Sequence, residues 1–481
     1  MEEYKLLVRR IGLVGIANLL VTLSSLILIP ILTKNFSIDE YGIWVQFTVS
    51  IALIPNIATL GLYYSMMRFL PAEEDKDKIK EGVYSIFTIV LITSFVLAFI
   101  FYLIAPYISN ALFDGNMFIA LIMAPAVVIV GMNTIVLYYF ITFQNMRVYS
   151  IFLLIQTYLA VLFVSYFSIS GFGISFTITA YLLSYLLILV VMIIFIVKKI
   201  GFKIPQFTNV REYLYLSLPT IPNDLSFWVV DSIDRYFIGI ILGTAFVGYY
   251  SPSYTLGKMV ILILTPISIV FPPILAKYYE KNQLEKVRMV LAYSIKYFLL
   301  IAIPFTIIIS LLSEPILMLL TTNEIAVNGY VVTPFVVMSL LFFGLYSILS
   351  NIIILKKKTK IIGIIWIICA GLNILINLAL IPSWGIIGAA LATLVSYGLA
   401  FLFIMLYSVR QFKINFNIKF IAKSLIATLP IIILISFCKP QGFIELLTAI
   451  FMSIILYLMV LFVLNAFEKE EIIFIKNLLI K

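Results

Sequence analysis

Apolar runs of about 20 residues or more recur along the whole chain, and the polar breaks between them reach only about fifteen residues. A helix of about 20 apolar residues crosses the hydrocarbon core of a bilayer. The runs lie at 11–33, 43–67, 83–105, 117–143, 149–170, 173–197, 213–242, 247–275, 293–313, 329–355, 361–381, 385–409, 419–437 and 442–465. The sequence therefore predicts an all-α polytopic membrane protein with about fourteen transmembrane helices and no soluble domain.

The composition excludes several other classes. Of 481 residues, 63% are hydrophobic and 11% are charged, which is typical of membrane proteins. The net charge of +10 indicates membrane orientation and contact with anionic lipids, not nucleic-acid binding. The chain has no histidine, and its two cysteines, Cys369 and Cys438, have neither metal-ligand spacing nor a disulfide framework. We therefore expect no metal site and no cofactor, with coupling to Na⁺ or protons left open.

Positive residues collect in every second break. Because cytoplasmic loops carry an excess of lysine and arginine, this alternation predicts an even number of spans and two cytoplasmic termini. The opposite breaks contain only Lys34 and Lys439. The basic residues of the N-terminus and of the even-numbered breaks are Lys5, Arg9, Arg10, Arg68, Lys76, Lys78, Lys80, Arg147, Lys198, Lys199, Lys203, Arg211, Lys277, Lys281, Lys286, Arg288, Lys356, Lys357, Lys358, Lys360, Arg410, Lys413 and Lys419.

The sequence also contains an internal repeat. The stretch from Gly173 to Tyr185 aligns without gaps on the stretch from Gly385 to Tyr397, 212 residues later. More loosely, Asp39-Glu40-Tyr41-Gly42 corresponds to Phe246-Val247-Gly248-Tyr249. We expect residues 1–200 and 201–412 to form two six-helix bundles of the same orientation, because repeats with an even number of helices are parallel. Residues 413–481 are then an appended helix pair with a cytoplasmic tail.

Three stretches carry a resemblance to a known family. They are Asn18 … Ile29-Pro30 … Asp39-Glu40-Tyr41-Gly42; Leu218-Pro219 … Asp231 … Asp234-Arg235-Tyr236 … Gly243 … Val247-Gly248-Tyr249-Tyr250-Ser251; and Asn373 … Asn377 … Ile381-Pro382 … Gly385-Ile386-Ile387-Gly388-Ala389-Ala390. With the six-plus-six-plus-two plan, the chain resembles the multidrug/oligosaccharidyl-lipid/polysaccharide exporter superfamily. Within it, the chain is most similar to the polysaccharide-biosynthesis branch, the flippases for lipid-linked oligosaccharides such as O-antigen units.

The resemblance implies two bundles that form a V around a cationic central cavity. It implies alternating access for a polyprenyl-phosphate- or polyprenyl-diphosphate-linked glycan. The heavy use of Ile and Lys with little Ala indicates an AT-rich prokaryotic genome, and we expect a monomer in a prokaryotic plasma membrane. Glycosyltransferases or a polymerase would be its functional partners. The arginine-rich first helix of the related peptidoglycan-precursor flippases has no counterpart in 11–33, which carries no charge inside the expected helix.

The predicted hairpin at 213–275 carries five ionisable residues inside its apolar spans. Such groups are costly in a membrane and usually face a polar cavity or pair with one another. Arg235 and Lys258 are candidates to bind the anionic phosphate of the substrate. Asp224, Asp231 and Asp234 are candidate counter-ions or ion-coupling groups. Alternatively, Asp231 and Asp234 only neutralise the two cations and hold the hairpin together.

For the other polar residues, two roles are possible, one in substrate binding and one in structure or orientation. Amides within the predicted helices either contact sugar or bind helices to one another; those kept as sugar candidates are Asn18, Gln46, Asn56 and Asn223. Asn373 and Asn377, together with Gly385–Ala390, indicate close helix packing. The run Lys356, Lys357, Lys358 and Lys360 is either an orientation signal or a site that captures anionic lipid headgroups.

Three functions are compared. A flippase for lipid-linked oligosaccharides accounts for the intramembrane cations. An ion-coupled drug or small-molecule exporter of the same superfamily predicts an acidic site with few cations. A membrane glycan polymerase or glycosyltransferase needs a large extramembrane loop, which the chain lacks. The sequence also lacks the phosphate-binding motif Gly-x-x-x-x-Gly-Lys-Ser/Thr, so we do not expect it to hydrolyse ATP. We therefore predict a transporter and not an enzyme.

Overall fold

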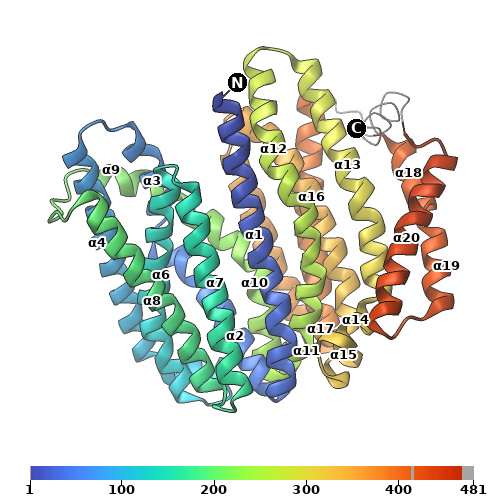
Figure 1. Ribbon diagram of the computed structural model, residues 1–481, viewed down its shortest axis with the longest axis horizontal. Helices are drawn as coiled ribbons and strands as arrows, with labels where there is room; N and C mark the ends of the chain where they lie inside the picture. The colour runs from blue at the N-terminus through green and yellow to red at the C-terminus, as the bar shows by residue number, and fades with distance from the viewer. Residues whose placement is uncertain (1, 413–416, 468–481) are drawn as a thin grey trace. The chain divides into compact units, whose positions relative to one another are not determined.

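The computed structural model describes the backbone of residues 2–412 and 417–467, and the side chains of the same residues except 2–11 and 269. Every regular element in these residues is a helix (Figure 1). The predicted all-α class is confirmed. The side chains of Lys5, Arg9, Arg10 and Lys413 and the predicted tail after residue 467 lie outside the described part.

The helices follow one another with short connections. They are α1 (Glu2–Asn35), α2 (Ile38–Ala58), α3 (Leu62–Phe69), α4 (Lys76–Leu103), α5 (Ala105–Leu112), α6 (Met117–Thr142), α7 (Met146–Ile169), α8 (Ile174–Ile200), α9 (Val210–Ser217), α10 (Ile221–Leu242), α11 (Thr244–Gly257), α12 (Ile261–Glu280), α13 (Leu284–Leu311), α14 (Ser313–Leu320), α15 (Asn323–Gly329), α16 (Thr333–Leu355), α17 (Lys360–Phe412), α18 (Ile418–Ile426), α19 (Leu429–Cys438) and α20 (Phe443–Val463).

Twelve stretches of the described chain are long and apolar enough to cross a membrane. One of them, α17, has 53 residues and a non-helical break at Gly385, so it contains the predicted runs 361–381 and 385–409. Another long helix, α10, has 22 residues but is not among the twelve, since it carries Asp224, Asp231, Asp234 and Arg235. The two runs within α17 and the omission of α10 together account for the difference between twelve stretches and the predicted fourteen spans. The number of fourteen spans stays a prediction.

Proline interrupts the predicted run 213–242. The chain forms α9, then a 3₁₀ turn at Leu218–Thr220, then α10. Pro219 and Pro222 supply no backbone N–H group, so regular α-helical hydrogen bonding cannot continue through them. The run 247–275 is likewise divided by a 3₁₀ turn at Lys258–Val260, between α11 and α12.

The described residues form two compact units, Met1–Ser251 with Trp366–Ala392 and Pro252–Ile365 with Thr393–Lys481. The boundary at Ser251 falls inside α11, whereas the repeat divides the sequence near residue 200. The predicted domains 1–200 and 201–412 follow the sequence repeat, so their bounds differ from those of the two compact units. They and the appended 413–481 stay predictions.

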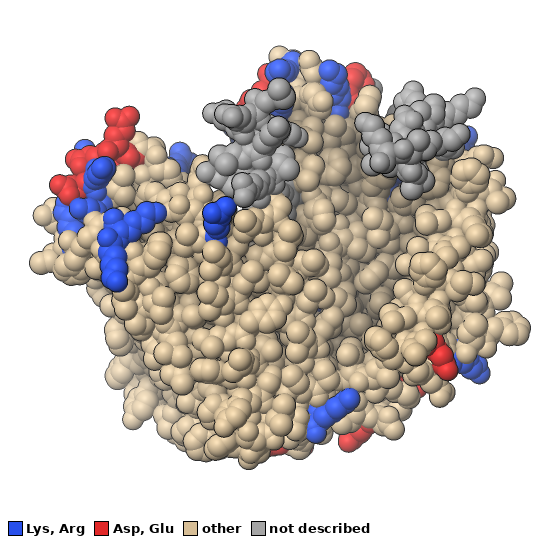
Figure 2. Space-filling view, in the orientation of Figure 1, with Lys and Arg blue, Asp and Glu red and all other residues tan. Residues whose placement is uncertain are grey.

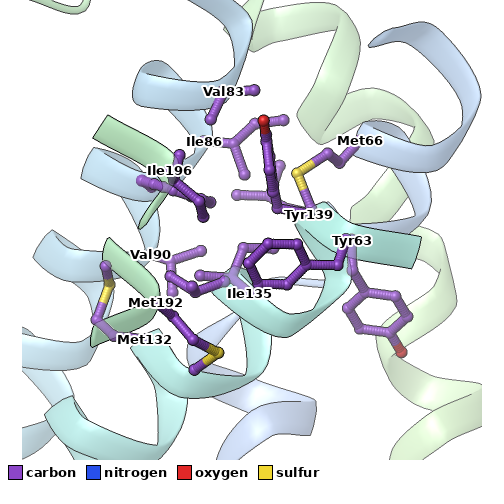
Figure 3. Close-up of a cluster of buried hydrophobic side chains, with 14 of the residues drawn as sticks. Tyr63, Met66, Val83, Ile86, Val90, Met132, Ile135, Tyr139, Met192 and Ile196 are labelled. Atoms are coloured by element: carbon purple, nitrogen blue, oxygen red, sulfur yellow. The ribbon is translucent and has the colours of Figure 1, made fainter. Parts of the chain in front are cut away.

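The first unit has a core between α3, α4, α6 and α8. Figure 3 shows Met66, Val83, Met132 and Met192 among its apolar side chains, and Tyr63 at its edge with the hydroxyl turned away. This core fixes α3 against the rest of the bundle.

The second unit has a core of its own, in which α18, α19 and α20 pack on α13 and α14. Phe420, Ile431 and Leu461 from the last three helices are buried in the same cluster as Ile308 and Leu312. The helices that follow residue 417 are therefore attached to this unit through apolar contacts.

Basic breaks meet at one end of each unit. In the first unit, Lys203 Nζ donates to the carbonyl of Asp77 at 2.9 Å. In the second unit, Lys356 donates to the side-chain oxygen of Gln411. The charged side chains visible in Figure 2 gather at helix ends and leave an uncharged surface between them. Within each unit this arrangement agrees with the alternation of basic breaks, and the cytoplasmic position of the termini stays a prediction.

The close turn at Gly385 in α17 can be tested. A Cβ atom at Gly388 would lie 2.6 Å from the carbonyl oxygen of Leu380, whereas one at Gly371 on the same helix would meet nothing within 4 Å. We expect Gly388→Ala to lower the thermal melting temperature in detergent, since overpacking costs about 1–3 kcal/mol. Gly371→Ala is the matched control and should melt like the wild type or slightly higher. Equal melting of the two variants would contradict the close packing.

Candidate functional site

The first unit concentrates its membrane charges on α10, which packs against α2. The helix carries three carboxylates and one guanidinium in 22 residues. In a medium of low dielectric constant each such charge must be paired or hydrated. The neighbours of α10 therefore decide what each charge can do.

Asp234 and Arg235 form a buried ion pair. The side chains of Asp234 and Arg235 are 1% and 8% exposed, and Arg235 Nη1 lies 2.8 Å from Asp234 Oδ1. Arg235 also donates to the carbonyl of Asp231, and the hydroxyl of Tyr250 on α11 donates to Asp234 Oδ2. The guanidinium lies 5.4 Å from the centre of the Tyr250 ring. This pair joins α10 to α11, and any substrate that binds Arg235 must replace some of these contacts.

Two polar residues of α2 bind the same region of α10. Gln46 is 0% exposed and donates through Nε2 to the carbonyl of Arg235 at 2.7 Å. Ser50 shares a hydrogen bond of 2.6 Å with the hydroxyl of Tyr236. Gly239 makes room for the Gln46 side chain, because a Cβ atom there would lie 2.1 Å from Gln46 Nε2. The structure thus places Gln46 between two helices in this conformation.

Two glycines close the contact between α2 and the start of α11. A Cβ atom at Gly42 would lie 2.0 Å from the carbonyl oxygen of Thr244, and one at Gly248 would lie 2.7 Å from the carbonyl oxygen of Ile38. Gly42 and Gly248 are 206 residues apart, as are Ile38 and Thr244. The two contacts are thus equivalent by a pseudo-two-fold relation. The offset of 206 residues is one residue shorter than the offset in the loose match of Asp39–Gly42 to Phe246–Tyr249.

A group of tyrosines surrounds Asp224 near the first turn of α10. The hydroxyl of Tyr63 donates to Asp224 Oδ2 at 2.6 Å, and that of Tyr64 to Oδ1 at 3.4 Å. The ring of Tyr138 on α6 stacks on Tyr63 with centroids 4.4 Å apart. Asn223 donates to Asp224 Oδ1 at 3.2 Å. Tyr64 is 37% exposed and Asp224 and Asn223 are half-buried, so the group is accessible from the surface of its unit.

This tyrosine–aspartate cluster (Tyr63, Tyr64, Tyr138, Asn223 and Asp224) lies at the end of α10 away from the ion pair. Asp224 and Arg235 are eleven residues apart, which corresponds to about 16 Å along a helix. The cluster lies near the end where α3 leads to the predicted cytoplasmic break. Unlike the buried ion pair, the cluster includes an exposed side chain, that of Tyr64.

The remaining candidates differ in their exposure. Lys258, in the second unit, is half-buried, and its Nζ lies 5.8 Å from the centre of the Tyr254 ring. Asn18 is exposed and Asn56 is half-buried. Of the four lysines in the basic run, Lys356 is half-buried, and its Nζ lies 5.2 Å from the centre of the Phe412 ring. The other three, Lys357, Lys358 and Lys360, are exposed.

Sequence reasoning missed the aromatic partners of the acids. Tyr63, Tyr64, Tyr138 and Tyr250 were not among the predicted site residues, although the neighbouring tyrosines at 63 and 64 were a visible signal. It did select the two acids that these tyrosines contact, Asp224 and Asp234. A sequence pattern selects ionisable residues, whereas their partners depend on how distant helices pack.

Comparison with known proteins identifies the family. Residues 31–327 match the family model described as Polysaccharide biosynthesis protein, which is more than half of the chain. The chain belongs to this family. The predicted resemblance to the polysaccharide-biosynthesis branch is confirmed.

Two curated relatives of this polysaccharide biosynthesis protein come from Haloferax volcanii. The probable low-salt glycan biosynthesis flippase Agl15 is 24% identical over 195 residues, 40% of this chain and 41% of the relative. The probable flippase AglR is 30% identical over 169 residues, 34% of this chain and 35% of the relative. The matches thus span less than half of each relative.

Solved structures establish the fold over most of the chain. The lipid II flippase MurJ in an inward closed conformation has a TM-score of 0.77 at 18% identity, covering 92% of this chain and 97% of that one. An inward-facing multidrug resistance MATE transporter has a TM-score of 0.66 at 14% identity, covering 82% and 94%. This polysaccharide biosynthesis protein is therefore a multi-span membrane protein with the fold of the exporter superfamily.

The buried pair can be tested by charge balance. We expect Asp234→Asn to lower the melting temperature, because it leaves Arg235 buried without its carboxylate, at a cost of about 3–5 kcal/mol. The double variant Asp234→Asn with Arg235→Gln should regain part of the loss, which a double-mutant cycle measures. Asp77→Asn, on the exposed start of α4, makes the same charge change as a control. Additive effects would contradict the pairing.

The glycine contacts can be tested in the same preparation. Gly42→Ala and Gly248→Ala each place a methyl group against a backbone carbonyl, so α2 and α11 must move apart. We expect both to lower the melting temperature, by the roughly 1–3 kcal/mol of an overpacked site. Gly371→Ala again serves as the control. Wild-type melting of both variants would show that the helices do not approach so closely.

Proposed function

We propose that the protein is a flippase that moves a lipid-linked oligosaccharide from the cytoplasmic to the outer leaflet of a prokaryotic plasma membrane. The carrier would be a polyprenyl phosphate or diphosphate, and the glycan would serve cell-surface polysaccharide or glycan synthesis. Membership of the polysaccharide biosynthesis family and the similarity to two probable flippases support this proposal.

The observation that carries the proposal is that two different kinds of polar group lie at separate positions along α10. At one end Asp224 and Asn223 present hydrogen-bonding groups beside stacked tyrosines, a combination that suits sugar hydroxyls and the apolar face of a sugar ring. About 16 Å farther along the helix, Arg235 supplies a guanidinium, the group best suited to bidentate contact with phosphate. A glycan joined to a lipid phosphate requires both chemistries.

In the proposed mechanism, a carboxylate of α10 pairs with Arg235 when the transporter has no substrate. Asp234 neutralises Arg235 while no substrate is bound. A substrate phosphate would take over this role during transport, and Lys258 in the second unit would be a further cation for it. Asp231 lies four residues before Arg235 on the same helix, and we propose it as the group that a proton or Na⁺ neutralises if transport is ion-coupled.

An ion-coupled exporter of small molecules is the second candidate. Its support is the fold shared with multidrug transporters. Arg235 favours the flippase instead, since a small organic cation needs no phosphate-binding arginine. Glycosyltransferases and a polymerase would act before and after the flippase, as functional partners.

Transport in proteoliposomes tests the proposal. We expect wild-type protein to move fluorescent polyprenyl-phosphate or polyprenyl-diphosphate oligosaccharides across the bilayer. Asp224→Asn, Tyr64→Leu and Lys258→Gln should each slow this movement by about tenfold, which corresponds to the loss of one good contact. Initial rates are measured from quenching of the fluorophore in the opposite leaflet.

The control for the aromatic variant is Tyr215→Leu on α9, since Tyr215 is 86% exposed and lies outside the tyrosine–aspartate cluster. Melting temperatures are measured for every variant, so that loss of folding is separated from loss of transport. If wild type moves no lipid-linked glycan but transports small organic cations along an ion gradient, the exporter replaces the flippase.

A further inference from the structure

A cavity of about 470 Å³ lies in the second unit between α14 and the turn that joins α19 to α20. Its size is in the range of sites that bind small molecules, roughly 300–1,000 Å³. The proposed transport does not use it, and the tyrosine–aspartate cluster and the Asp234–Arg235 pair belong to the other unit. The α13–α14 junction and the α19–α20 turn both fall in breaks that the charge alternation assigns to the outer side.

The lining is half apolar and half polar. Leu312, Met318, Ile435 and Pro440 form apolar walls. Glu314, Ser436, Lys439 and Gln441 supply the polar groups. No aromatic ring lines the cavity, so it lacks the stacking surface that a sugar site uses.

Glu314 and Lys439 bring opposite charges to this cavity. Glu314 is a half-buried carboxylate at the start of α14, and Lys439 lies at the end of α19. Among the described residues, neither side chain has a recorded hydrogen bond or ion pair, and they do not bridge to each other. Both charges are available to a ligand, and a simple anion or cation would be repelled by one of them.

The backbone of Lys439 has a conformation that glycine adopts more readily than lysine. It has φ of 39° and ψ of 58°, in the left-handed region, and its N–H group bonds to the carbonyl of Ile435. Glycine is the usual residue at such a helix end, because an L side chain is strained there. Lys439 is also one of two basic residues in the outer breaks, against the charge bias of the loops. Lys439 thus places a cation in a break that otherwise has none.

We propose that this cavity binds the zwitterionic headgroup of an outer-leaflet phospholipid that carries a primary ammonium group. Lys439 contacts the phosphate, and Glu314 accepts hydrogen bonds from the ammonium. The exposed apolar side chains of Leu311 and Met318 border the cavity and receive the first part of the acyl chains. The bound lipid would join α14 to the α19–α20 turn and so fasten the last helices to α13 and α14.

Lipid binding by the purified protein tests this proposal without reference to transport. Delipidated protein in detergent is titrated with dioleoylphosphatidylethanolamine, and bound lipid is counted by native mass spectrometry. We expect Glu314→Gln and Lys439→Gln each to weaken binding by about tenfold. Binding of dioleoylphosphatidylglycerol, which lacks the ammonium, should be weaker in wild type and should not be weakened further by Glu314→Gln.

Two control variants make the same charge changes elsewhere. Lys34→Gln and Asp114→Asn alter residues that do not line the cavity, and they should bind phosphatidylethanolamine as the wild type does. Equal binding of the two lipids by wild type, or unchanged binding in both cavity variants, would overturn the proposal.

Lys439→Gly separates binding from folding. Glycine relieves the strained backbone, so this variant should melt at a higher temperature than wild type in lipid-free detergent while it loses the added stability that phosphatidylethanolamine gives the wild type. A variant that is more stable and still responds fully to the lipid would show that the lysine side chain does not hold the headgroup.

Discussion

A charge inside the membrane must be compensated by its neighbours, and this requirement organises the first unit. Asp234 and Arg235 neutralise each other, and Tyr250 completes the hydrogen bonding of the carboxylate. Gln46 then binds the carbonyl of Arg235 from α2. The charged residues of α10 therefore determine which helices pack against it and how closely they approach. The same groups make α10 a poor lipid-facing helix.

Much of the fold could be predicted, because apolar runs and basic breaks are local properties of the sequence. The runs 117–143, 149–170 and 173–197 correspond closely to α6, α7 and α8. The interruptions at Pro219 and at Lys258 were less visible, since average hydropathy does not register a single missing hydrogen bond or a 3₁₀ turn. The division into compact units at Ser251 depends on tertiary contacts, which a sequence repeat does not specify.

The site was predicted in part. The acids and the arginine of α10 were recognised because ionisable residues are rare in apolar runs. Their partners were not, because Tyr63 and Asp224 are 161 residues apart. They are brought together by the packing of α3 against α9, the helix that leads into α10. The exchange of Asp234 for a substrate phosphate, and the roles of Asn18, Asn56 and the Lys356–Lys360 run, stay predictions.

The reciprocal contacts of Gly42 and Gly248 bear on the origin of the chain. Each glycine meets the backbone of the residue four positions before the other. In a dimer of identical six-helix chains, a single glycine would occupy both places, and one substitution would open both contacts at once. Joining the two halves in one polypeptide removes that constraint. Each half can then carry side chains that the other lacks. The charges of α10 have no counterpart between Gly12 and Thr33 of α1.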